Sequence, residues 1–146
     1  MAEAVAEARK AYERGEVPVG AVVEKDGIII GRGHNLTETS KDPTAHAEII
    51  AIRGAASVLG GWRLLECNVY VTCEPCAMCA GALVLARIKK LFIGTPDPKS
   101  GACGSVLSVV QNPGLNHYIE IETGIMKPVC EQLMKDFFSA RRKVNI

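Results

Sequence analysis

The sequence contains no apolar run of the about 18 residues that a membrane-spanning helix requires. Its N-terminus, Met1–Lys10, lacks the basic start and apolar core of a secretory signal. Neither sign of charge is in excess, because 17 Lys and Arg stand against 16 Asp and Glu, leaving a net charge of +1. We therefore expect a protein without a membrane partner, located in the cytoplasm or, after loss of a leader, in an organellar stroma. Any surface that attracts nucleic acid must be local.

Internal repeats, low-complexity segments and an obvious linker are also missing from the chain. A length of 146 residues is typical of one domain, so we expect a single domain over residues 1–146. A chain of this size buries roughly two-thirds of its extended-chain surface, which is enough to form a core without disulfides or a metal. A metal site in this chain would therefore indicate chemistry before it indicated structural support.

Apolar periodicity predicts an α/β protein. Helices are expected at residues 2–14, 42–59, 76–86 and 127–142, and strands at residues 17–23, 28–33, 68–72, 90–93 and 118–121. Asp26-Gly27 between the first two strands indicates a hairpin. The later alternation of strands and helices implies parallel strands joined by crossover helices. The 42–59 helix has apolar residues on all sides and is expected to be buried, while residues 95–116 are expected to form a functional loop with at most one helical turn.

Two short motifs carry the candidate chemistry: His46-Ala47-Glu48 and Pro75-Cys76-Ala77-Met78-Cys79, each near the start of a predicted helix. Thiolates at a helix N-terminus are stabilised by the helix dipole and by free backbone N–H groups, which favours metal binding. His46 and Glu48 can reach one site only in the first helical turn, since mid-helix residues two apart point in nearly opposite directions. We therefore expect the two helix N-termini to converge beside the carboxyl ends of the parallel strands.

His46, Cys76 and Cys79 supply three ligands, whereas a structural zinc takes four. The remaining position would be open to water, and Glu48 is suited to act as the base. Other interpretations compete with this one. Cys73, Cys76 and Cys79 match the Cys-x-x-Cys-x-x-Cys pattern of an iron–sulfur site, but no cysteine follows at the spacing that a fourth ligand would need. A redox Cys-x-x-Cys pair and a structural zinc with Cys103 as its fourth ligand stay open as alternatives.

These motifs resemble the zinc-dependent nucleobase deaminases of the cytidine and deoxycytidylate deaminase superfamily, whose signature combines His-x-Glu with Pro-Cys-x-x-Cys. Further segments resemble the tRNA-specific adenosine deaminase branch, so that the resemblance covers nearly the whole chain. These segments are residues 15–21, 42–48, 74–82, 97–99, 104–105, 115–117 and 137–138. Cys73 departs from the family pattern, which usually has a larger apolar residue at this position.

The resemblance implies a three-layer α/β/α fold with a five-stranded mixed sheet. It also implies a homodimer that converts adenosine at the wobble position of a tRNA anticodon loop to inosine, with release of ammonia. His46, Cys76 and Cys79 would bind one Zn²⁺ per chain, which carries a water or hydroxide, and Glu48 would be the catalytic residue that moves protons. Asn35 would hold the flipped base, and the backbone N–H of Ala47 would face the substrate.

RNA contacts are predicted from basic and aromatic side chains near the motifs. Lys99, Arg142 and neighbouring basic residues are candidates for binding phosphate, and Asp97 lies in a segment that resembles the family. Phe137 or Phe138 could stack on an unpaired base, and we predict Phe138 for this role. The pair Lys89-Lys90 is a further candidate for phosphate.

Two other functions share parts of this pattern. A deaminase of free guanine or cytosine would also carry His-x-Glu and Pro-Cys-x-x-Cys. The long 95–116 loop and the basic terminal helix favour the RNA-acting branch over it. A non-enzymatic, zinc-stabilised RNA-binding module would need a closed metal site, in which Glu48 would have no role.

Overall fold

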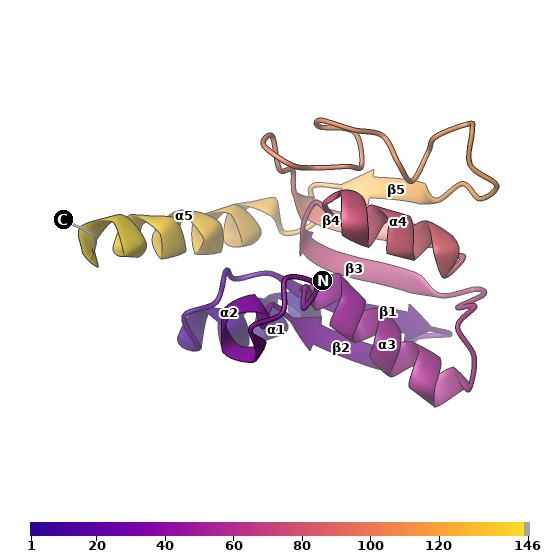
Figure 1. Ribbon diagram of the computed structural model, residues 1–146, viewed down its shortest axis with the longest axis horizontal. Helices are drawn as coiled ribbons and strands as arrows, with labels where there is room; N and C mark the ends of the chain where they lie inside the picture. The colour runs from indigo at the N-terminus through magenta and orange to yellow at the C-terminus, as the bar shows by residue number, and fades with distance from the viewer. Residues whose placement is uncertain (145–146) are drawn as a thin grey trace.

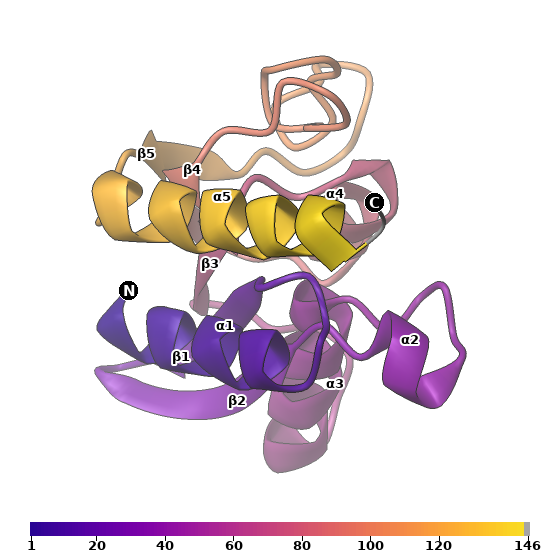
Figure 2. The same cartoon turned by 90° about the vertical axis from the view of Figure 1, so that its left-hand side faces the viewer.

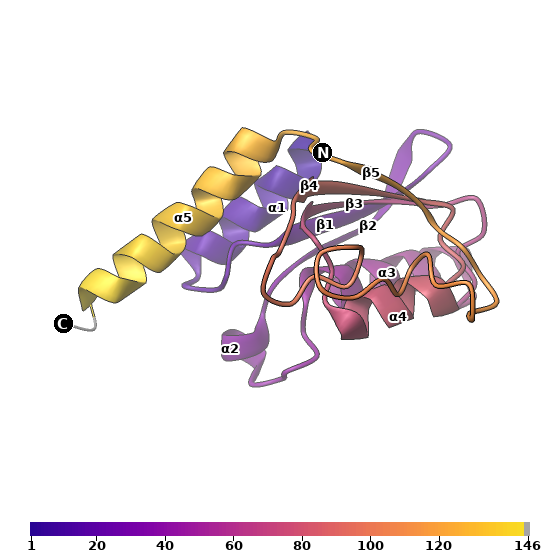
Figure 3. The same ribbon diagram turned by 90° about the horizontal axis from the view of Figure 1, so that it is seen from above.

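The computed structural model describes residues 1–144 and has three layers, with a mixed β-sheet between two pairs of helices (Figures 1 and 3). Helices α1 and α5 cover one face of the sheet and lie side by side (Figure 2), whereas α3 and α4 cover the other. The elements are α1 (Ala2–Glu13), β1 (Gly20–Lys25), β2 (Ile28–His34), α2 (Thr37–Ser40), α3 (Ala47–Leu59), β3 (Asn68–Cys73), α4 (Ala77–Leu85), β4 (Lys90–Thr95), β5 (Glu120–Thr123) and α5 (Lys127–Val144).

The five strands are arranged in the order β2-β1-β3-β4-β5. Strand β1 pairs antiparallel with both β2 and β3, and β4 pairs parallel with β3 and β5. The predicted α/β/α architecture, mixed sheet and parallel strands are therefore confirmed. The predicted hairpin is also confirmed, because Lys25 pairs with Ile28 around Asp26 and Gly27, which both have positive φ.

Helix α3 packs unusually close to β2, and two glycines make this approach possible. A Cβ at Gly33 would lie 2.3 Å from the carbonyl oxygen of Ala47, and one at Gly31 would lie 2.2 Å from that of Ala51. The helix contributes small side chains to the same contact, including the fully buried Ala47, Ala51 and Ala55. Because Ala47 is the first residue of α3, this packing fixes where the helix N-terminus lies on the sheet.

The start of α3 differs from the prediction. Asp42 does cap a turn, since its Oδ1 accepts hydrogen bonds from the backbone and hydroxyl of Thr44, but the chain does not become helical there. The helix begins five residues later with His46 as its N-cap in an extended conformation. The expectation that α3 is buried on all sides is also wrong, because Val58 is 65% exposed near its end.

Other differences are smaller. The first strand begins at Gly20 rather than Val17, and the last strand lies two residues further along than predicted. The short helix α2 was not predicted, and residues 96–119 form turns and one isolated bridge, Cys103 to Ser108, without a helical turn. Within residues 1–144, no helix has the length and apolar character needed to cross a bilayer.

Candidate metal centre and substrate cleft

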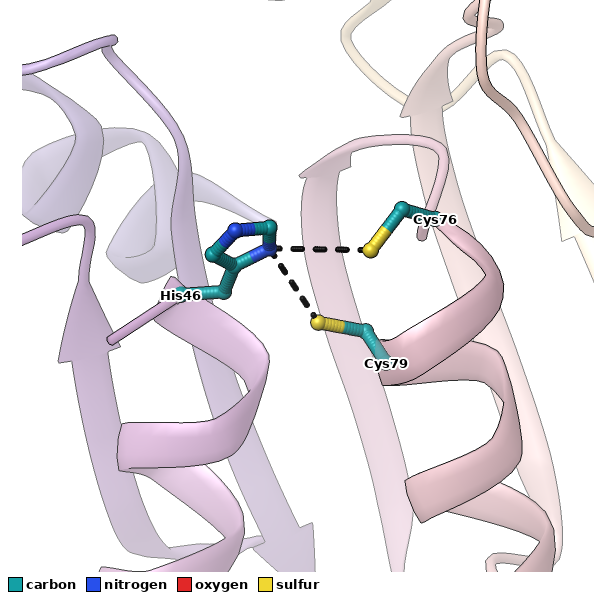
Figure 4. Close-up of side chains that lie close together, drawn as sticks. All are labelled: His46, Cys76 and Cys79. Carbon is teal, nitrogen blue, oxygen red and sulfur yellow. Dashed lines mark hydrogen bonds between the residues drawn. The ribbon is translucent and has the colours of Figure 1, made fainter. Parts of the chain in front are cut away.

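The predicted metal ligands come together at the N-termini of two helices (Figure 4). His46 is the N-cap of α3 and Cys76 is the N-cap of α4, while Cys79 lies in the first turn of α4. The Nδ1 atom of His46 lies 3.6 Å from the Sγ atom of Cys76 and 3.5 Å from that of Cys79. The three donor atoms all lie within 4.8 Å of one another. The predicted convergence of the two helices is therefore observed.

This spacing fits a tetrahedral metal ion. Bond lengths of about 2.0–2.1 Å for Zn–N and about 2.3 Å for Zn–S place a nitrogen and a sulfur on one tetrahedron about 3.6 Å apart. Among residues 1–144, no Asp, Glu, Cys or further His joins the three in this group, so neither Cys73 nor Cys103 adds a sulfur to it. The donor set is therefore nitrogen, sulfur and sulfur, which suits a borderline-soft ion and provides three of four ligands.

The thiols of the site differ in acidity. A hydrogen bond with Cys79 lowers the pKa of Cys76 to about 5, and the same pairing together with burial raises the pKa of Cys79. The pair therefore holds one proton, which a divalent cation would displace because metal binds the thiolate form. Burial raises the pKa of both Cys73 and Cys103 to about 12, so these two remain neutral thiols at pH 7.

Glu48 lies beside the metal-ligand group, in the first turn of α3. Its side chain is 3% exposed, and desolvation raises its pKa above the ordinary carboxylate value. A carboxylate with a raised pKa is a better proton acceptor than an ordinary one and can return the proton afterwards, which is what an acid–base catalyst requires. The first turn of α3 therefore presents a metal ligand and a candidate proton carrier to one site.

A cleft of about 1230 Å³ opens in front of these residues. Its inner wall includes His46, Glu48 and Cys76, together with the ends of β3 and β4 at Cys73 and Thr95. The site thus lies at the carboxyl ends of the parallel strands, as predicted. Predicted substrate-binding residues also line the cleft, namely Asn35, Asp97, Lys99, Phe138 and Arg142.

Asn35 and Ala47 form a pair rather than two separate contacts. The backbone N–H of Ala47 donates a hydrogen bond of 2.9 Å to Oδ1 of Asn35, and Ala47 is fully buried. The N–H of Ala47, predicted to face the substrate, is therefore directed to Asn35 in this structure. Asp97 is similarly engaged, because its carboxylate accepts hydrogen bonds from the backbone of Lys99 and from Ser100.

Helix α5 supplies the outer wall of the cleft and distinguishes the two adjacent phenylalanines. Phe137 is buried and contacts Tyr12 edge-to-face at 6.0 Å, whereas Phe138 is 40% exposed and lines the cleft. Lys89 and Lys90 are not near the cleft. They precede or begin β4 at the end opposite Thr95, and they form ion pairs with Glu66 and Glu122. Lys89 and Lys90 therefore could contact RNA phosphates only outside this cleft, and that role stays a prediction.

Two buried carboxylates that sequence reasoning missed hold the irregular segments around the cleft. Glu16 is fully buried and accepts hydrogen bonds from the backbone of Glu38 and Thr39 and from the hydroxyls of Thr37 and Thr39 at the start of α2. Burial opposes ionisation of Glu16, but these donors outweigh it and lower its pKa. Glu74 accepts hydrogen bonds from the loop after β4, including those from the backbone of Asp97 and Cys103. These donors outweigh burial and lower the pKa of Glu74. Neither carboxylate carries a local signal of this role in the sequence, because Glu16 follows the charged Glu13 and Arg14, and Glu74 adjoins the Pro-Cys motif.

An α/β/α fold with His-Ala-Glu and Pro-Cys-x-x-Cys at two converging helix N-termini is the arrangement expected of a nucleobase deaminase. Comparison with known proteins agrees, since residues 1–142 match the family model of MafB19-like deaminases. The chain is 46% identical to the tRNA-specific adenosine deaminase of Bacillus subtilis over 98% of its own length and 89% of that protein. The chain therefore belongs to the tRNA-specific adenosine deaminase family.

Two solved structures illustrate the range of similarity. A structure from work on A-to-I editing by tRNA:A34 deaminases at the wobble position of transfer RNA is 44% identical, with a TM-score of 0.88 over 91% of this chain and 96% of that one. The guanine deaminase of Bacillus subtilis is 36% identical, with a TM-score of 0.64 over 97% of this chain and 90% of that one. The chain is therefore more similar to the RNA-editing structure than to this guanine deaminase, both in sequence identity and in TM-score.

Proposed function

We propose that this protein hydrolyses adenosine at the wobble position of a tRNA anticodon loop to inosine and ammonia, using one Zn²⁺ held by His46, Cys76 and Cys79. The observation that carries the proposal is the geometry of the cleft, in which three metal donors at tetrahedral spacing and the buried Glu48 face exposed Phe138 and Arg142. The ion would supply an acidified water at the ligand position that the protein leaves open.

Glu48 performs the proton transfers in this proposal. Its carboxylate takes a proton from the attacking water and delivers it to the ring nitrogen next to the attacked carbon, which makes that carbon electrophilic. Glu48 then takes the proton of the hydroxyl that has been added to this carbon and delivers it to the exocyclic amine, which leaves as ammonia while the C=O bond of hypoxanthine forms. The atoms balance as one water added and one ammonia released. The raised pKa of Glu48 suits both roles, because the group must gain and lose a proton in each cycle.

Recognition of the base falls to the rest of the cleft. Asn35 holds the flipped base with its side chain, whose orientation is fixed by the hydrogen bond from the Ala47 N–H. Phe138 stacks on a neighbouring unpaired base, and Lys99 and Arg142 contact phosphates. The cleft is lined by the exposed Phe138, Lys99 and Arg142 beyond the buried metal donors, which supports a substrate larger than a free base.

A direct assay tests this function against deamination of free bases. The zinc-loaded protein would be incubated with an anticodon stem-loop that carries adenosine at the wobble position and, separately, with guanine and cytosine. Inosine should form at the wobble position only, as measured by nuclease digestion and mass spectrometry. Ammonia released from a free base, with an unchanged stem-loop, would contradict the proposal and favour the 36% identical guanine deaminase as the better guide.

We also propose that residues 1–146 form one domain that works as a homodimer in the cytoplasm, where its tRNA substrate is processed. Large apolar side chains remain exposed after the end of α3, at Trp62 and Leu65, and at the last residue of α4, Leu85. They lie near one another, since the backbone N–H of Leu64 donates to the carbonyl of Ala86. Light scattering should give twice the chain mass for the wild type and a monomer for Leu65→Glu; a monomeric wild type would contradict the dimer.

A further inference from the structure

We propose that Glu74 is a positioning residue, which holds the 97–105 loop against the start of the metal-ligand helix and thereby sets the affinity for RNA. The side chain is 7% exposed and belongs to none of the groups that act in the proton transfers. Glu74 follows the end of β3 directly and precedes Pro75 and Cys76 in the chain. The inference rests on the proposed function, because it concerns how that cleft recognises its substrate.

The carboxylate of Glu74 organises the loop through four hydrogen bonds. Oε1 accepts from the backbone N–H of Asp97 at 3.1 Å and from the hydroxyl of Ser105. Oε2 accepts from the backbone N–H groups of Cys103 and Ser105, at 3.0 and 3.1 Å. The donors thus come from both ends of the loop, and one side chain closes it.

Two further contacts fit the loop around this carboxylate. A Cβ at Gly101 would lie 2.3 Å from Oε2 of Glu74, so only glycine leaves room for the carboxylate. The backbone N–H of Ala102 donates to the carbonyl of Pro75 at 2.8 Å, which ties the loop to the residue before Cys76. The loop therefore cannot move away from the start of α4 while these bonds persist.

The part of the loop that faces the cleft depends on the same anchor. Asp97, Lys99 and Ser100 line the cleft, and the Asp97 carboxylate in turn accepts hydrogen bonds from the backbone of the other two. Holding the backbone of Asp97 thus places Lys99, the proposed phosphate contact, on the wall. Glu74 also lines the cleft, but both of its carboxylate oxygens are taken up by donors of the loop, so its loss should weaken binding more than it slows the proton transfers.

An ionised carboxylate is needed because all four partners are donors, two to each oxygen. In Glu74→Gln the amide nitrogen faces at least one backbone N–H, which cannot accept a hydrogen bond, whichever way the side chain is turned, although the size of the side chain is unchanged. Ser105→Ala is milder, because it removes one of the four bonds and leaves the carboxylate intact. The matched control is Glu13→Gln, the same chemical change on the exposed surface of α1.

The test combines backbone hydrogen exchange, metal content and steady-state kinetics on the zinc-loaded proteins. In Glu74→Gln we expect faster exchange of the Asp97, Cys103 and Ser105 amides, unchanged exchange in α3, and unchanged zinc per chain. KM for the anticodon stem-loop should rise by about tenfold or more, with kcat changed by no more than a few fold. Ser105→Ala should shift both quantities in the same direction by less, and it replaces Glu74→Gln if that variant does not fold.

Unchanged exchange in the loop of both variants would overturn the proposal, and so would a fall in kcat at unchanged KM. The exchange experiment needs no substrate, so it separates this inference from the proposed function. If the wild-type protein forms no inosine, the proposed function fails, while the exchange of Asp97, Cys103 and Ser105 still decides whether Glu74 holds the loop.

Discussion

The two walls of the cleft are built in different ways. The inner wall consists of regular elements, the N-termini of α3 and α4 on the sheet, and its position is fixed by apolar and backbone packing such as the contact of Gly33 with Ala47. The outer wall consists of α2, the 97–105 loop and α5. The buried carboxylate of Glu16 holds α2, and that of Glu74 holds the loop. In the proposed function, the inner wall carries the metal ligands and the proton carrier, and the outer wall recognises the RNA. Changes in the inner wall should therefore affect turnover, and changes in the outer wall should affect affinity.

The largest effect is expected from Glu48→Gln on the inner wall. Removing the proton carrier should lower kcat by at least about 10² to 10⁴-fold, while zinc content, fold and stem-loop affinity are retained. Inosine formation in single-turnover experiments, with metal analysis of the same sample, measures this. Unchanged turnover in this variant would remove Glu48 from the mechanism, whereas absence of turnover in both the variant and the wild type, with zinc and RNA affinity retained, would favour the closed, non-enzymatic metal site.

Gly33→Ala tests whether backbone packing positions the inner wall. The added Cβ would collide with the Ala47 carbonyl, so the free energy of unfolding should fall by about 1–3 kcal/mol and the start of α3 should shift. The control is Gly81→Ala in α4, where a Cβ meets no atom within 4 Å and should raise stability by roughly 0.5–1 kcal/mol. Urea denaturation measures the stability of both variants. A Gly33→Ala variant as stable as the wild type would show that α3 tolerates displacement.

Phe138→Ala tests the outer wall without touching the metal site. Loss of a stacking platform should weaken stem-loop binding by about 1–3 kcal/mol and leave kcat at saturating RNA nearly unchanged. Tyr118→Ala is the matched control, because Tyr118 is 64% exposed but is not among the residues that line the cleft. Fluorescence anisotropy measures both affinities. A fall in kcat at unchanged affinity would contradict the assignment of RNA recognition to the outer wall and of catalysis to the inner wall.

Glu16→Gln should lower the free energy of unfolding at pH 7 by about 1–3 kcal/mol, without a direct effect on the metal site or on base stacking. The folded-state pKa of Glu16 lies below its ordinary value of 4.5, so the ionised carboxylate stabilises the fold above that pH. This stabilisation is lost as pH falls through the lowered pKa, because the protonated group resembles the amide. The difference between wild type and variant, from urea denaturation at several pH values, should therefore shrink in acid. A constant difference would contradict the pKa shift.

The sequence predicted the chemical groups of the inner wall better than the contacts that hold the two walls in place. The candidate metal ligands and Glu48 could be singled out because their motifs are local, and each motif lies at the start of one helix. Gly31 and Gly33 gave no such signal, since the need for glycine arises from a helix that packs on them from elsewhere in the chain. Glu16 and Glu74 were missed for a related reason, because their hydrogen-bond donors lie more than 20 residues away.

Local signals also misled where tertiary contacts decided the outcome. Asp42-Pro43 is typical of a helix start, but Asp42 caps only the turn at Thr44, and the close packing of Ala47 on Gly33 sets the start of α3. The apolar end of α3 was expected to be buried, yet the fold covers the side of the helix that meets β1, β2 and α4 and leaves Val58 exposed. The adjacent phenylalanines could be distinguished only when Tyr12 of α1 was seen to contact Phe137.

The central claim is that the metal site has three protein ligands and one open position. The zinc K-edge X-ray absorption spectrum of the purified protein tests it most directly. We predict one zinc per chain with two sulfur neighbours near 2.3 Å and two lighter neighbours near 2.0–2.1 Å, one of them from His46. A spectrum with three or four sulfur neighbours, or protein purified without chelators that contains no zinc, would contradict the account.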